Sequence, residues 1–133
     1  MKRSPKILVL LGYGLALLGT ADCGSSCDDL QDQARRASQS AADKADRSCS
    51  VDSDCVLANH GVSCIDSCRS EEASVASAAA STLAGQVRSA DDKYCGQFKR
   101  QGCEVVLLPC DPPSNVPAAS CQQGQCVLTF VPL

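Results

Sequence analysis

Eleven cysteines, all located after residue 22, constrain this 133-residue chain more than any other feature. They make up about a tenth of residues 23–133, which is the composition of a disulfide-bonded scaffold. The chain has no Trp, and beyond residue 22 only Tyr94, Phe98 and Phe130 supply aromatic bulk. A domain with so modest a core depends on cross-links, each stabilising it by about 2–4 kcal/mol and forming in an oxidising compartment. We therefore predict a disulfide-stabilised domain outside the cytoplasm.

The N-terminus is typical of an export signal. Lys2, Arg3 and Lys6 precede an apolar run from Ile7 to Gly19, and a basic start followed by such a run is the layout of a secretory signal peptide. At about 1.5 Å per residue the run spans only about 20 Å, whereas the hydrocarbon core of a bilayer is about 30 Å thick. We predict that residues 1–22 are a signal peptide rather than a membrane span.

Two cleavage sites are open. Gly19 and Ala21 suit an ordinary signal peptidase that cuts after Ala21. The sequence Thr-Ala-Asp-Cys at 20–23 resembles instead the end of a bacterial lipoprotein signal, in which the cysteine becomes the lipid-bearing first residue. Residues 24–26 (Gly-Ser-Ser) then resemble the flexible tether of such proteins. The resemblance implies lipidation of Cys23.

The odd number of cysteines bears on this choice, because an odd thiol in an exported protein needs an explanation. A thioether-linked lipid on Cys23 leaves ten cysteines, enough for five disulfides; the alternative is one free thiol or an intermolecular bridge. We favour an outer-membrane or cell-surface lipoprotein, with the membrane as partner through the anchor, over simple secretion. The disulfide candidates are Cys27, Cys49, Cys55, Cys64, Cys68, Cys95, Cys103, Cys110, Cys121 and Cys126.

The mature chain divides into a tether with an N-terminal helix at 23–48 and a Cys-rich domain at 49–133. Small and apolar residues recur at helical spacing within 27–47, and Ser26 with Asp29 resembles a capping box with Asp in place of Glu, so we predict a helix there. A partly disordered stalk is the alternative. Farther on, residues 56–58 predict a short strand that ends at the Asn-His-Gly turn of 59–61.

The Ala-rich stretch 70–88 predicts a helix capped by Ser70, with Glu71 and Glu72 in its first turn. It either continues to Arg100 or breaks at Ser89 into a second helix, and Gly102 ends both versions.

The C-terminal part of the chain predicts strands. Residues 104–108 (EVVLL) predict one, 109–118 a proline-rich irregular loop, and 121–126 a turn leading into a last strand at 127–131. The expected fold class is α+β: a small disulfide-rich domain with one or two helices packed on a short antiparallel sheet.

The cysteine pattern from 49 to 126 resembles the small eight-cysteine-cluster domain of secreted and lipid-anchored bacterial proteins, especially the myxobacterial kind. The likeness rests on the CSVDSDCV sequence at 49–56, on Pro109-Cys110, on the ASC sequence at 119–121 and on the GQC sequence at 124–126. It covers about 80 residues, with nine cysteines in place of eight. The resemblance implies a location and a fold type, and it brings no assigned activity.

No sequence pattern indicates catalysis or a cofactor. His60, the only histidine, lies in a turn with Ser63 nearby, and we interpret it as a surface residue. No C-x-x-C occurs, and although His60, Cys64 and Cys68 have helical spacing, we expect disulfides there rather than a metal site. Cleavage leaves nine basic and fourteen acidic residues without a basic cluster, which disfavours nucleic acid as a partner. Paired carboxylates, Asp52 and Asp54 among them, are expected to cap helices and turns.

One loop merits a binding hypothesis. The prolines between Cys110 and Cys121 stiffen a segment that cysteines hold at both ends, and a preordered loop loses less entropy on binding. The candidate residues are Asp111, Pro112, Pro113, Ser114 and Asn115. We expect a non-enzymatic binding or structural protein of the cell envelope whose protein partner is unknown; the alternative is a secreted protease inhibitor or ligand-binding module that uses the 110–121 loop.

Overall fold

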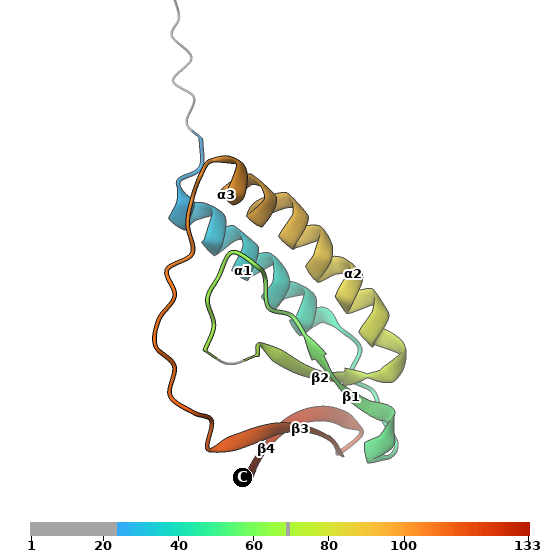
Figure 1. Ribbon diagram of the computed structural model, residues 1–133. Coiled ribbons are helices and arrows are strands. Elements are labelled where there is room, and N and C mark those ends of the chain that lie inside the picture. Colours follow the sequence, from blue (N-terminus) through green and yellow to red (C-terminus); the bar gives the residue numbers. More distant parts are fainter. Residues whose placement is uncertain (1–23, 69) are drawn as a thin grey trace, which may run out of the picture.

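The computed structural model describes residues 24–68 and 70–133. Within them the chain forms three layers: helices, an inner hairpin of β1 and β2, and an outer hairpin of β3 and β4 (Figure 1). The α+β class expected from the sequence is confirmed. The predicted signal peptide and Cys23 lie outside the described residues.

Helix α1 (Cys27–Lys44) begins at the predicted capping box. The Asp29 amide donates to Ser26 Oγ at 3.1 Å, and the Ser26 amide donates to the Asp29 carboxylate at 3.2 Å. One stripe of the helix is buried at four-residue intervals, by Leu30, Ala34, Ser38 and Ala42. Because this stripe packs against α2, the N-terminal helix is part of the folded domain and not a disordered stalk.

The inner hairpin pairs β1 (Cys55–Asn59) with β2 (Glu72–Ala76) in antiparallel register. The predicted strand and its end at the 59–61 turn are confirmed, but the helix predicted from residue 70 is wrong in its first half. Val75 pairs with Val56 and lies in the core, so cross-strand pairing and burial outweigh the helix propensity of the Ala-rich segment. Ser70 therefore caps no helix, and Glu72 belongs to a strand.

The second helical segment starts later than predicted and then runs without a break. Helix α2 (Ala80–Ala90) passes through a π-helical turn (Asp91–Cys95) into α3 (Gly96–Arg100), so the predicted extension to Arg100 is confirmed. Gly102 ends the segment at φ +75°, a conformation that favours glycine.

The outer hairpin pairs β3 (Asn115–Gln122) with β4 (Gln125–Pro132). Gln123 and Gly124 both have positive φ, as a two-residue type I′ turn requires, so the predicted turn is confirmed. The loop predicted at 109–118 is wrong in its second half, since β3 begins at Asn115. The strand predicted at 104–108 is also wrong: that segment pairs with no other strand among the described residues.

The two faces of the inner hairpin contact different layers. Ala73 and Val75 join the main core, in which Leu30, Leu83 and Phe98 are almost fully buried. Side chains alternate along a strand, so Glu72, Ser74 and Ala76 face the outer hairpin instead. No helix of the described residues is long and apolar enough to cross a membrane.

Five disulfides hold the layers together. Two of them, Cys49–Cys121 and Cys55–Cys126, join the outer hairpin to the rest of the domain. Cys64–Cys95 fastens the 61–68 loop to the long helical segment. The remaining two fix the ends of the segment that follows Gly102: Cys27–Cys103 and Cys68–Cys110.

Candidate functional site

The segment between α3 and β3 is the most exposed apolar part of the described chain. We call residues 104–110 the strap; it runs along one side of the domain from the helices to the outer hairpin (Figure 1). The exposed fractions of Val106, Leu107 and Leu108 are 74%, 79% and 64%. Three consecutive apolar residues at such exposure are costly in water, and exposed apolar patches are typical of interaction surfaces.

The strap is held at its ends, while most of its backbone is not paired with any described residue. Disulfides fix Cys103 just before it and Cys110 at its end. Within it, the Leu108 amide donates to the Asp66 carboxylate at 2.8 Å, and no other strap amide donates to a described residue. The strap therefore presents free backbone donors and acceptors beside its apolar side chains, as an unpaired edge strand does.

The binding loop predicted from the sequence is only partly a loop. Asp111, Pro112, Pro113 and Ser114 form an exposed irregular segment that continues the strap, whereas Asn115 is the first residue of β3. The Ser114 carbonyl accepts a hydrogen bond from the Leu133 amide at 3.1 Å, which fastens this loop to the end of β4. The surface that sequence analysis missed is the strap, because EVVLL has the composition of a paired, half-buried strand.

A groove of about 350 Å³ opens beside the end of this loop, between the two hairpins. Its walls are mostly apolar and include Val116, Pro117, Leu128 and Phe130 of the outer hairpin. The inner hairpin contributes Glu72, whose Oε2 is buried and has no hydrogen-bond partner among the described residues. Cys68, Ser70, Pro113 and Asn115 complete the lining.

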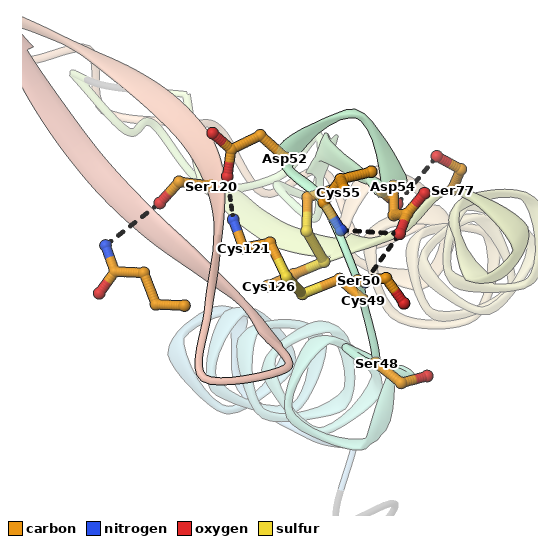
Figure 2. The surroundings of a disulfide bond; sticks show 12 residues. Ser48, Cys49, Ser50, Asp52, Asp54, Cys55, Ser77, Ser120, Cys121 and Cys126 are labelled. Carbon is orange, nitrogen blue, oxygen red and sulfur yellow. Dashed lines mark hydrogen bonds between the residues drawn. A yellow bond between two sulfur atoms is a disulfide. The ribbon is translucent and has the colours of Figure 1, made fainter.

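The opposite end of the hairpin interface is closed by polar contacts and sulfur (Figure 2). Asp54 accepts hydrogen bonds from the amides of Ser50 at 2.7 Å and Val51 at 3.1 Å, and these bonds lower the pKa of its carboxyl group. Asp52 accepts from the Cys121 amide at 2.7 Å. The expectation that these carboxylates cap a turn is confirmed for Asp54, whereas Asp52 bonds to the backbone of β3 instead.

His60 does not lie on the surface as expected. Its side chain is 9% exposed, and its Nδ1 lies 3.9 Å from a carboxylate oxygen of Glu71. The His60 amide donates to the Glu71 carbonyl at 2.7 Å, which extends the β1–β2 pairing by one residue. Because side chains alternate along a strand, His60 then lies on the same face as Val56 and Ala58, which pack against the core. Ser63 is hydrogen-bonded instead to Asp91 and Lys99, which fasten the 61–68 loop to the helix.

Cysteine sulfurs gather at one point without forming a thiolate site. The Sγ atoms of Cys49, Cys55 and Cys126 lie within 4.8 Å of one another, but each belongs to a disulfide. Cys64 and Cys68, considered above with His60, are also disulfide-bonded. Oxidised sulfur lacks the thiolate charge that binds metal.

No protein-family model, curated protein or solved structure matches the chain. The resemblance drawn from the cysteine pattern therefore extends to a small cysteine-rich domain, here with five disulfides, and not to a family. Five disulfides indicate an oxidising, extracytoplasmic location.

Proposed function

We propose that the mature protein is a non-enzymatic envelope protein, anchored by a lipid on Cys23, that binds a polypeptide partner through the strap. The observation that carries the binding role is the exposure of Val106, Leu107 and Leu108 next to unpaired backbone. An extended partner segment can pair with such an edge through main-chain hydrogen bonds while its side chains cover the apolar ones. The two disulfides at the strap ends reduce the entropy lost on binding.

The anchor is supported by the cysteine count. The ten cysteines from Cys27 to Cys126 pair with one another, so none of them is left for Cys23. A thioether-linked lipid is the role that we propose for that sulfur. The intact mass of the exported protein, before and after reduction and alkylation, tests this role: we expect a lipid-modified N-terminus and ten cysteines that alkylate only after reduction. A mass that starts at Asp22 or earlier would contradict it.

Site-specific cross-linking tests the binding role. A photoreactive residue at position 107 in the lipid-anchored protein, irradiated in the producing cell, should give one discrete protein adduct that mass spectrometry can identify. Position 39 is the control, because Gln39 is an exposed residue of α1 outside its buried stripe. Equal adduct formation at 107 and 39, or none at 107, would refute binding through the strap.

Protease inhibition is the second candidate, and the same geometry favours it. An extended, exposed segment held at both ends has the shape of a protease substrate, and the strap has this shape while β3 does not. The inhibitory loop proposed from the sequence at 110–121 is accordingly moved to 104–114. Purified protein assayed against serine and cysteine proteases tests it: inhibition that weakens in Leu107→Asp supports the inhibitor, and no inhibition at micromolar concentration rules it out.

A further inference from the structure

The two hairpins are joined at one end of their interface and separate at the other. Cys55–Cys126 and Cys49–Cys121 close the end where β1 and β4 begin. Glu72 starts β2 and pairs with Asn59 at the far end of β1, away from the cross-links. The groove lies at this far end, and Cys68, which is disulfide-bonded to Cys110, is one of its lining residues.

One wall of the groove consists of apolar side chains that face the inner hairpin and yet remain exposed to solvent. Side chains alternate along each strand of the outer hairpin, so residues an even number of positions from Cys121 or Cys126 share their face. This face carries Pro117, Leu128 and Phe130. The side chains on this face therefore point toward the inner hairpin, yet Phe130 remains 58% exposed. An aromatic ring that faces a neighbouring layer without being covered by it is available for stacking.

A single charge lies on the opposite wall. The Glu72 Oε2 atom is buried, makes no hydrogen bond and has no ion pair among residues 24–68 and 70–133, and no Lys or Arg lines the groove in those ranges. Leaving a carboxylate oxygen desolvated and unpartnered is costly, and a positively charged donor removes that cost. The groove thus combines a carboxylate with an apolar, aromatic wall.

We propose that this groove binds an arginine side chain of the polypeptide partner. A guanidinium group pairs with a carboxylate through two parallel hydrogen bonds, and it also stacks on an aromatic face. The aliphatic stem packs against Leu128 and Pro117, and the Glu72 side chain turns its buried Oε2 toward the head group to accept the second hydrogen bond. A volume of about 350 Å³ at the lower end of the range for ligand pockets suits one side chain rather than a large ligand.

This inference depends on the proposed function in one respect: it takes the partner to be a polypeptide. Its location supports this link, since Pro113 lines the groove and follows the strap along the chain. A partner extended along the strap would thus reach the groove.

Nuclear magnetic resonance titration with acetyl-Leu-Arg-Leu-amide tests the proposal on the purified mature protein. We expect saturable shifts of the Val116, Leu128 and Phe130 amides. The matched probe carries citrulline, which keeps the shape of arginine without its charge, and it should bind at least about tenfold more weakly. Glu72→Gln should lose binding to the same extent, whereas Glu71→Gln should retain it.

Three results would overturn the proposal: no saturable shift at millimolar peptide, equal binding of the citrulline peptide, or binding that appears only in Arg69→Ala. The last result would mean that Glu72 pairs with Arg69 of the same chain and not with a partner. The citrulline comparison uses the unaltered protein, so the test stands even where Glu72→Gln fails to fold. Cross-linking at position 107 reports on the strap alone, and therefore each proposal can fail without the other.

Discussion

Replacing Leu30 by Ala tests whether α1 is a structural part of the domain. Leu30 is 1% exposed and lies in the main core with Leu83 and Phe98. The substitution removes the equivalent of about three methylene groups, or about 2.4 kcal/mol of transfer free energy. The cavity that remains adds to this, so we expect the free energy of unfolding to fall by about 3–5 kcal/mol.

Urea denaturation under non-reducing conditions measures this loss while all five disulfides stay intact. With a slope of about 2 kcal/mol/M, a loss of about 3 kcal/mol lowers the midpoint by roughly 1.5 M at unchanged slope. Leu83→Ala, also 1% exposed, should behave similarly. Leu107→Ala is the matched control, because its side chain is 79% exposed and its loss should change stability by less than about 0.5 kcal/mol.

The prediction is refuted if the free energy of unfolding falls by less than about 1 kcal/mol in Leu30→Ala but by about 3–5 kcal/mol in Leu83→Ala. A side chain that is this deeply buried in a packed core cannot be truncated with so small a loss of stability. The helix 27–44 would then be a tethered stalk that only the Cys27–Cys103 bridge holds near the domain.

Three further outcomes follow from single features of the fold. Gly102→Ala should lower stability by about 1 kcal/mol in denaturant titration, because Gly102 has φ +75°, which strains any residue with a Cβ; an unchanged midpoint would contradict this. The pKa of Asp54 is lowered by hydrogen bonds from backbone amides, so its contribution to stability is present at neutral pH and is lost as the pH falls through the folded-state pKa. Asp54→Ala should accordingly destabilise the protein at neutral pH and much less in acid, and a pH-independent difference would speak against the mechanism. Replacing both Cys27 and Cys103 by Ala should cost about 4 kcal/mol, measured as a lower melting temperature, since the bridge closes a sequence separation of 76 residues; a loss under about 1 kcal/mol would show that the other bridges already impose its constraint.

The sequence alone was sufficient wherever neighbouring residues decide the conformation. The Ser26–Asp29 capping box begins α1, Gly102 ends the long helical segment, and the turn predicted within 121–126 is formed by Gln123 and Gly124. Each of these signals acts over a few residues, through a local hydrogen bond or through a backbone angle that few residue types adopt. The disulfide-stabilised α+β class likewise followed from cysteine content and from a core too small to suffice alone.

The tertiary structure decided what depends on distant partners. Residues 72–76 favour a helix by composition, but pairing with β1 and burial on both faces make them a strand. Residues 104–108 have strand composition and yet pair with nothing described, because β4 pairs with residues 115–122 across the tight turn. The exposure of the strap, and the groove in which Glu72 Oε2 has no partner among the described residues, depend on how distant segments are held together, including by the Cys27–Cys103 and Cys68–Cys110 bridges. Which segments meet is set by pairing and cross-linking across long sequence separations, to which local propensity contributes little.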